Sequence, residues 1–297
     1  MHNHLPSRTA IVVALGCLCT LKLARPGFWD ERVDQLLRTS LRAAGLPYRI
    51  LESFSRTRTG SRLLNALMSA VIPGMFAHYV ARKILIEKWT RHELEKGTKR
   101  LLVIGGGLDT LALRIATDYP AVTVEEWDHP ATQYFKRRAL ASDLATRKNL
   151  QLSSIDLNET NEGPWQRLAN AQTEPIIVVI EGVLMYLQEA NVRNTLRNIL
   201  SICTPQGSCI LSFMEVDKSG RIGFRNSRKG FVDAWLSKRQ ESFLWGIQPS
   251  AMSDWLTQQG WKVRSLSDHS ELKTIITTAG PALEDPAAGE HLVHAAI

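Results

Sequence analysis

The stretch Arg100-Leu-Leu-Val-Ile-Gly-Gly-Gly-Leu-Asp-Thr-Leu111 decides the fold expected for this chain. A short apolar run leads into three glycines and then into a polar-capped segment that favours a helix. This order predicts a strand, a tight turn and a helix N-terminus, the place where an α/β sheet binds a nucleotide-like ligand. At Gly105 a side chain would keep the backbone away from such a ligand. Thr110 replaces the last glycine of a dinucleotide fingerprint, so a purely structural turn is the alternative.

The second signal is Asp128, which follows an apolar-rich run at 121–127 and lies twenty-three residues after Gly105. An acid at the end of the second strand is placed to accept hydrogen bonds from both hydroxyls of a ribose. Glu125 and Glu126 are rivals, but both fall inside the expected strand. Asp128 could also cap the helix expected to start near Pro130, and the two roles are compatible.

Four motifs occur in the order and spacing of a known family. They resemble the successive motifs of the leucine carboxyl methyltransferase-like family, whose members are S-adenosylmethionine-dependent methyltransferases with a Rossmann-like fold. The resemblance extends from about residue 70 to the C-terminus and, more faintly, over residues 7–10. The motifs are residues 105–110, 126–130, 156–157 and 181–187.

The resemblance implies S-adenosylmethionine as the cofactor and a set of contacts to it. In such families the turn glycines contact the methionine part, the second-strand acid holds the ribose, and an Asp-Leu pair flanks the adenine. An upstream arginine holds the cofactor's carboxylate, and an acid after the fourth strand lies beside the sulfonium. No catalytic residue follows from the motifs, and Leu111 departs from the arginine usual in relatives. The implied cofactor-binding residues are Arg82, Gly105, Asp128, Asp156, Leu157 and Glu181.

For three of these residues, the surrounding sequence gives a separate argument about the implied role. Glu181 ends an almost wholly apolar run, and a carboxylate there is costly unless a cation pairs with it. Arg82 lies in a mostly apolar helical segment, where an arginine either reaches outward to solvent or meets an anion. The neighbouring Lys83 shares that position, so the choice of Arg82 comes from the resemblance. Asp156 ends the third expected strand and could bind an adenine amino group or cap the next helix.

A general base is needed only for some acceptors. His129 and Tyr186 could act as a base for a phenol or alcohol, whereas a carboxylate needs none. The alternative for His129 is helix capping or a backbone contact, and Tyr186 could instead pack beneath the next helix.

The composition indicates a globular chain with a basic balance. With 297 residues, 44% of them hydrophobic, the chain can bury a large core as one α/β domain with additions or as two domains. Lys and Arg (36) exceed Asp and Glu (29), giving a net charge of +7. The basic clusters are not interleaved with aromatics, so we expect solvated faces and no nucleic-acid partner. These clusters are Arg56, Arg58 and Arg62; Lys136, Arg137 and Arg138; and Arg221, Arg225, Arg228 and Lys229.

Cysteine usage and the N-terminus favour a cytoplasmic protein. Cys17, Cys19, Cys203 and Cys209 have no metal-ligand spacing, which predicts reduced thiols and no zinc or other metal site. Residues 10–21 resemble a signal-peptide core, but basic residues follow closely and disfavour export. The run is shorter than the ~20 apolar residues that cross a membrane, so no membrane partner is expected. The resemblance makes it the first helix of a cap over the active site.

Alternating strand and helix signals predict a Rossmann-like class I methyltransferase fold of the α/β class. We expect a mostly parallel sheet with helices on both faces. We treat the chain as one domain, 1–297, with a helical cap at 1–75 and a core at 76–297. Within the core, an insertion at about 216–248 would overhang the pocket. The expected strands are 100–104, 121–127, 150–155, 175–181, 207–214, 261–266 and 291–297.

The predicted reaction is O-methylation of a carboxyl or hydroxyl group, with a small molecule as acceptor. A protein C-terminal carboxylate is the alternative acceptor, because that activity is known in the resembled family. An NAD-dependent oxidoreductase and a non-catalytic binding protein are the rival classes. The sequence predicts neither the acceptor's identity nor the oligomeric state.

Overall fold

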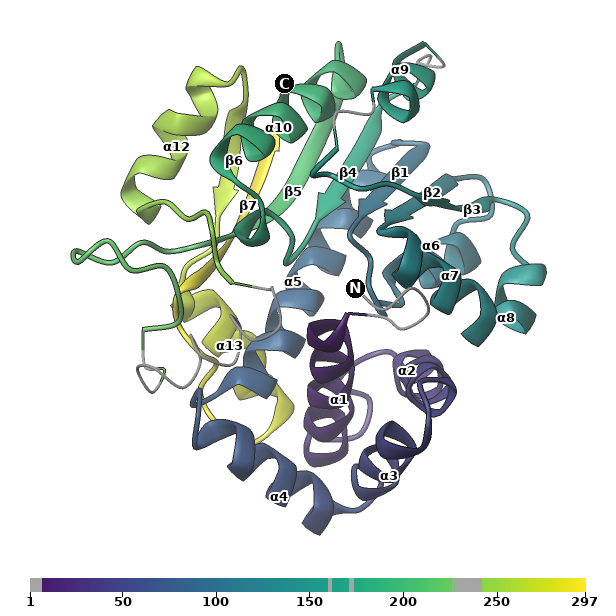
Figure 1. Cartoon of the computed structure of the whole chain (residues 1–297), viewed down its shortest axis with the longest axis vertical. Coiled ribbons are helices and arrows are strands. Elements are labelled where there is room, and N and C mark those ends of the chain that lie inside the picture. Colours follow the sequence, from purple (N-terminus) through teal and green to yellow (C-terminus); the bar gives the residue numbers. More distant parts are fainter. Residues whose placement is uncertain (1–6, 160–161, 171–173, 226, 228–241) are drawn as a thin grey trace.

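The computed structural model describes residues 7–159, 162–170, 174–225, 227 and 242–297. Its centre is a seven-stranded sheet in the order β3-β2-β1-β4-β5-β7-β6 (Figure 1). Strands β1 to β5 run parallel, whereas β7 lies antiparallel between β5 and β6. The strands are β1 (Arg100–Ile104), β2 (Thr123–Asp128), β3 (Leu150–Ser154), β4 (Ile176–Ile180), β5 (Gly207–Met214), β6 (Lys262–Leu266) and β7 (Glu290–Ala296).

The strand order reverses between β1 and β4, which pair in register from Arg100↔Ile176 to Ile104↔Ile180. In open α/β sheets ligands bind outside the carboxyl ends of the strands at such a reversal. The turn after β1 and the residue after β4 are therefore neighbours at the ligand-binding edge.

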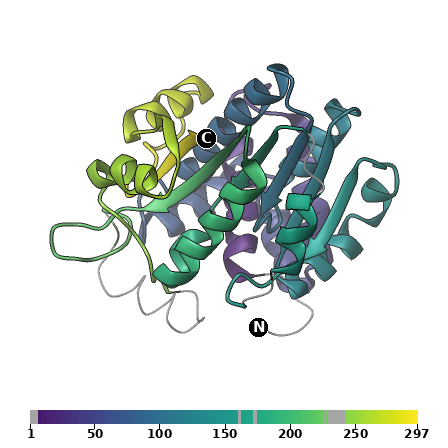
Figure 2. The same ribbon diagram turned by 90° about the horizontal axis from the view of Figure 1, so that it is seen from above.

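Alternate residues of the central strands enter two apolar cores, one on each face of the sheet. Leu102 and Ile180 belong to the first core, and Leu101 and Val179 belong to the second. Burial on both faces explains why β4 is a continuous apolar run, because helices cover both sides (Figure 2). The first core includes residues of α9 (Gly163–Asn170), α10 (Glu189–Cys203) and α12 (Pro249–Gln258); the second includes residues of α5 (Met75–Glu95), α6 (Leu111–Asp118) and α13 (His269–Ala279).

The first four helices of the chain lie beyond the carboxyl edge of the sheet (Figure 1). Ser7 caps the first of them by accepting hydrogen bonds from the backbone N–H groups of Thr9 and Ala10. This helix contains the apolar run at 10–21, which packs in a third core with α2 and α5. No helix among the described residues is long and apolar enough to cross a membrane. The four helices are α1 (Arg8–Leu23), α2 (Glu31–Ala43), α3 (Leu46–Phe54) and α4 (Arg58–Ser69).

The fold-class prediction is confirmed, and every expected strand is present within two residues of its expected ends. Helix α3 is an additional element, because Gly45-Leu-Pro47 by itself predicts only the end of the preceding helix: glycine accepts a left-handed cap and proline cannot continue a helix. The proline also fits the first turn of a new helix, where no hydrogen bond from its nitrogen is needed. The division into a cap at 1–75 and a core at 76–297 stays a prediction. The remaining elements are α7 (Pro130–Ala139), α8 (Ala141–Ala145) and the 3₁₀ helix η1 (Leu184–Tyr186).

One exposure prediction is wrong. Lys136 was expected on a solvated face, but its side chain is buried and donates to Glu126 at 2.7 Å. The short helix α7 turns one side toward the sheet, and the long stem of Lys136 reaches a carboxylate behind the glycine turn. The neighbouring Arg137 and Arg138 are exposed as expected. Arg228 and Lys229 lie outside the described residues.

Candidate functional site

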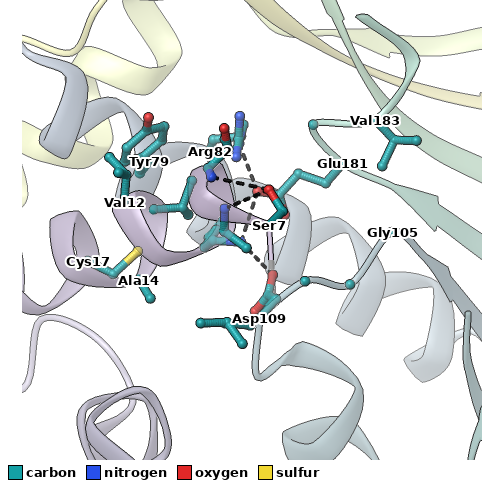
Figure 3. Close-up of a pocket in the computed structure, with 18 of the residues that line it drawn as sticks. Ser7, Val12, Ala14, Cys17, Tyr79, Arg82, Gly105, Asp109, Glu181 and Val183 are labelled. Atoms are coloured by element: carbon teal, nitrogen blue, oxygen red, sulfur yellow. Dashed lines mark hydrogen bonds and ion pairs between the residues drawn. The ribbon is translucent and has the colours of Figure 1, made fainter. Parts of the chain in front are cut away.

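A cavity of about 590 Å³ lies at the carboxyl edge of the sheet, between the strand ends and the N-terminal helices. Its volume falls within the range of small-molecule sites, roughly 300–1,000 Å³. Figure 3 shows the charged part of its wall, where α1, α5 and the loops after β1 and β4 converge. All six predicted cofactor-binding residues line this cavity: Arg82, Gly105, Asp128, Asp156, Leu157 and Glu181.

The glycine turn at the end of β1 is sterically constrained. Gly105 has a φ of +70°, and a Cβ atom there would collide with the side chain of Val183. At Gly106 a Cβ atom would meet the carboxyl group of Glu126 at 2.6 Å. The turn therefore requires glycine for the fold itself, in addition to leaving the backbone open to the cavity.

The carboxyl group of Asp128 accepts hydrogen bonds from the backbone, and the residue also lines the cavity. Its Oδ2 accepts from the N–H of Gly107 at 2.5 Å, and its Oδ1 accepts from the N–H of His129 at 2.6 Å. Burial raises the pKa of the Asp128 carboxyl, although these two donors act against the rise. The rivals Glu125 and Glu126 are not among the cavity-lining residues, because Glu126 pairs with a lysine and Glu125 with an arginine behind the turn.

A cluster of buried charges forms one end of the cavity. The Nε of Arg82 donates to Glu181 at 2.8 Å, and its Nη1 donates to Glu290 at 2.5 Å. Lys83 donates to Asp109 at 2.6 Å and to Glu181 at 3.0 Å. Arg82 and Lys83 thus both point at anions, and the outward-reaching alternative for Arg82 is wrong, because the residue is only 6% exposed.

The acids and bases of this cluster shift one another's ionisation. Burial lowers the pKa of Lys83, but the carboxylates of Asp109 and Glu181 outweigh burial and raise it. Burial raises the pKa of Glu290, but Arg82 and His78 outweigh it and bring the pKa to about 2. Lys83 and Glu290 are therefore both charged near neutral pH.

The cluster holds three carboxylates against Arg82 and Lys83, with His78 2.9 Å from Glu290, so carboxylates exceed the arginine and lysine side chains by one. In a buried wall such an excess favours a cationic ligand. Sequence reasoning assigned no role to Asp109 or Glu290. Asp109 belongs to the glycine-rich stretch, but Glu290 precedes an apolar C-terminal run and carries no motif that could have identified it.

The region after β2 and β3 combines capping with cavity lining. His129 caps α7, and its Nδ1 accepts from the N–H of Ala131 at 3.3 Å. Its Nε2 lies 3.8 Å from Asp156 Oδ2. Asp156 also accepts from the N–H of Asn158 at 2.9 Å, in a turn that precedes the start of α9 at Gly163. The predicted capping alternative is therefore realised for His129 but not for Asp156. Both still face the cavity.

The other end of the cavity is apolar and comes from distant parts of the chain. Tyr186 lines it and packs on Phe243, with ring centroids 5.6 Å apart. Phe224 and Phe243 belong to the described part of the predicted insertion; residues 226 and 228–241 lie outside the described residues. The remaining apolar lining residues here include Leu64, Leu67, Met68, Val71, Ile72, Met75, Met185 and Met214. Sequence patterns missed these residues because each resembles ordinary core.

Metal binding and disulfides find no support in the described residues. No group of three or more His, Cys, Asp or Glu there could hold a metal ion. All four cysteines are buried and free.

The cavity where the strand order reverses, the glycine turn after β1 and the acid at the end of β2 together define a class I methyltransferase architecture. A sequence model described as leucine carboxyl methyltransferase matches residues 10–200. The chain belongs to the leucine carboxyl methyltransferase family. It is accordingly an S-adenosylmethionine-dependent methyltransferase, with S-adenosylmethionine as its cofactor, and this favours methyl transfer over the oxidoreductase alternative.

Individual relatives are more distant than the family match suggests. A provisionally named S-adenosyl-L-methionine-dependent methyltransferase of Mycobacteroides abscessus is 26% identical over 210 residues, covering 69% of this chain and 67% of its own length. A protein of the same name from Mycobacterium bovis is 27% identical over 270 residues, covering 86% of this chain and 73% of its own. A solved structure, a DUF574 family protein from Streptomyces avermitilis, aligns with a TM-score of 0.56 at 13% identity, covering 80% of this chain and 90% of its own; this likeness concerns the fold alone.

Proposed function

We propose that this methyltransferase O-methylates a small molecule, with a carboxylate on an apolar body as its preferred acceptor. The observation that carries the proposal is the division of the cavity into a charged end and an apolar end. The charged end suits a zwitterionic, cationic cofactor. The apolar end suits the body of the acceptor, because it lacks the charges that would hold a polar one.

The residues present fit the cofactor chemically. We assign the cofactor's ribose to Asp128, its adenine to Asp156 and Leu157, and its methionine part to the turn at Gly105. Asp128 keeps free lone pairs on both oxygens despite its two backbone donors. Each assigned polar residue is an acceptor where the cofactor offers hydroxyl or amino donors.

We assign the cofactor's carboxylate to Arg82 and its cationic groups to Glu181. Arg82 and Lys83 both donate to Oε1 of Glu181, so its Oε2 can accept from an ammonium or lie beside a sulfonium. The carboxylates already bound to Arg82 hold its guanidinium in place, so little side-chain entropy is lost when a ligand binds.

S-adenosylmethionine supplies an electrophilic methyl group on a sulfonium. The protein's own task is to align the acceptor with that group and to exclude water. An acceptor that is already an anion requires no proton removal. His129 and Asp156 both already accept hydrogen bonds from backbone N–H groups, which favours a carboxylate acceptor over an alcohol.

A protein C-terminal carboxylate is the alternative acceptor, suggested by the name of the family. It offers the same nucleophile on a peptide. The reaction chemistry is then identical, and only the body of the acceptor differs.

The test is methyl transfer from S-adenosylmethionine labelled on its methyl group. Purified full-length protein is incubated with apolar carboxylic acids, phenols, alcohols and peptides ending in a free carboxylate. A methyl ester releases labelled methanol in mild alkali, whereas a methyl ether does not. We expect alkali-labile product from apolar acids. Alkali-stable product would contradict the carboxyl assignment, and product only from peptides would select the alternative. Cofactor binding without transfer to any acceptor would favour a non-catalytic binding protein.

A further inference from the structure

Exposed apolar side chains gather on α3 and α4. Nine large hydrophobic residues are exposed among the described residues, and five of them lie on these two short helices. They are Leu46 (69% exposed), Ile50 (52%), Phe54 (49%), Leu63 (52%) and Leu67 (61%). We call these five side chains the α3–α4 apolar face. Such a concentration marks an interaction site more often than chance exposure does.

Helical spacing aligns these residues. Leu46, Ile50 and Phe54 are four residues apart on α3, and Leu63 and Leu67 are four apart on α4, so each set follows one side of its helix. A Cβ atom added at Gly60, in the first turn of α4, would collide with the backbone of Phe54, the last residue of α3, so the end of one helix lies against the start of the next. Figure 1 shows both at the end of the molecule farthest from the sheet.

Arginines flank this face with almost no opposing acid. Between residues 45 and 70 the sequence has four arginines and a single acid, Glu52. Glu52 is buried and already pairs with Arg38, Arg42 and Arg56. In the part of the chain that the structure describes, the exposed Arg49, Arg58 and Arg62 have no ion-pair partner. These three arginines give the face a positive charge.

We propose that the α3–α4 apolar face docks on the surface of an anionic lipid bilayer. Apolar side chains enter the interface between headgroups and acyl chains, and nearby arginines attract anionic headgroups. A second copy of the chain is a poorer occupant, because a symmetric contact would bring the two sets of arginines together. This peripheral contact differs from membrane crossing and goes beyond the proposed function.

The docked face borders the cavity. Leu67 is both exposed and part of the cavity wall, and Leu64 and Met68 on the same helix line the cavity beside it. A bilayer at this face therefore lies next to the apolar end, where the acceptor is expected.

The proposal is tested by sedimentation of the full-length protein with vesicles. One set contains phosphatidylcholine alone and the other contains phosphatidylcholine mixed with phosphatidylglycerol. We expect binding to the anionic vesicles to be at least about tenfold tighter and to weaken as salt increases. The double variant Leu46→Ser/Ile50→Ser removes exposed apolar area, and Arg58→Gln/Arg62→Gln removes charge. Each is expected to weaken binding at least about tenfold.

Two control variants on β6 test whether a loss of vesicle binding is specific to the α3–α4 apolar face. Leu266→Ser, at a residue 38% exposed on β6, and Lys262→Gln on the same strand are expected to bind like the unaltered protein. Circular dichroism and S-adenosylmethionine binding check that each variant is folded.

Four outcomes overturn the proposal. The first is no preference for anionic vesicles, and the second is equal loss of binding in the β6 controls. The third is a dimer in light scattering that Leu46→Ser/Ile50→Ser dissociates, which assigns the face to a second copy. Retention on poly-L-glutamate without vesicle binding would likewise overturn it and assign the face to an acidic protein.

Discussion

The guanidinium of Arg82 and the carboxylate of Glu181 lie 2.8 Å apart, although ninety-nine residues separate them in the chain. One side chain comes from α5 and the other follows β4, so the ion pair connects a helix to the sheet edge. Arg82 and Glu181, which we propose bind opposite charges of the cofactor, therefore also fix each other's side-chain positions.

This relationship predicts that Glu181→Gln weakens the binding of S-adenosylmethionine. The substitution removes the negative charge that faces both cations and the excess negative charge that favours a cationic ligand. Charged hydrogen bonds contribute about 1.5–3 kcal/mol, which corresponds to a loss of roughly 10- to 100-fold in affinity. Isothermal titration measures it. Glu189→Gln, at an exposed acid on α10, is the control and should change nothing. Equal affinities for the two variants would contradict the role of Glu181.

The glycine turn gives a second prediction with an internal control. Gly105→Ala places a side chain in a left-handed conformation and against Val183, whereas Gly97→Ala has the same backbone problem with nothing within 4 Å. Left-handed strain costs about 1–2 kcal/mol in both variants. Gly105→Ala should therefore be the less stable of the two in thermal denaturation, and it alone should lose cofactor binding. If both variants melt and bind alike, the turn at Gly105 is not sterically constrained.

The sequence predicted the sheet well because its signals are local. The apolar runs at β1 and β4 are buried on both faces, and the glycines after β1 end that strand where the structure ends it. Helix α3 was missed because a proline can either follow the end of one helix or occupy the first turn of the next, and the sequence pattern at Pro47 does not separate the two roles.

The cavity was only partly predictable for a different physical reason. Gly105 and Asp128 follow strands directly, so position along the chain places them at the ligand-binding edge. Glu290 contacts Arg82 only because β7 inserts next to β5, a long-range pairing that no local pattern encodes. Lys136 was misplaced because its partner Glu126 lies on another element.

Acid sensitivity of the fold follows from His294. Burial lowers its pKa to about 4, although Glu93 opposes the change; Arg264, Lys96 and His92 add to the lowering. The unfolded chain takes up a proton near pH 6.5, whereas the folded chain does so only near pH 4. Between these values the unfolded state binds more protons, so the free energy of unfolding falls as pH falls. The loss at pH 4.5 should be about 1–3 kcal/mol.

Urea denaturation between pH 7 and 4.5 measures this loss. His294→Gln should show a shallower fall than the unaltered protein over the same range. Glu290, with a pKa of about 2, adds its own loss only as pH falls below its unfolded value near 4.5, so it does not affect this window. Parallel pH curves for the two proteins would show that His294 is protonated equally in both states.

The most direct measurement is isothermal titration of the full-length protein and Asp128→Asn with S-adenosylmethionine and with NAD. Asparagine keeps an oxygen for one of the two N–H groups of Gly107 and His129, whereas alanine would leave both without an acceptor. The cavity account predicts one S-adenosylmethionine site, weaker or absent NAD binding, and an affinity reduced about 5- to 100-fold in Asp128→Asn. Tighter binding of NAD, or an S-adenosylmethionine affinity unchanged by Asp128→Asn, would contradict it.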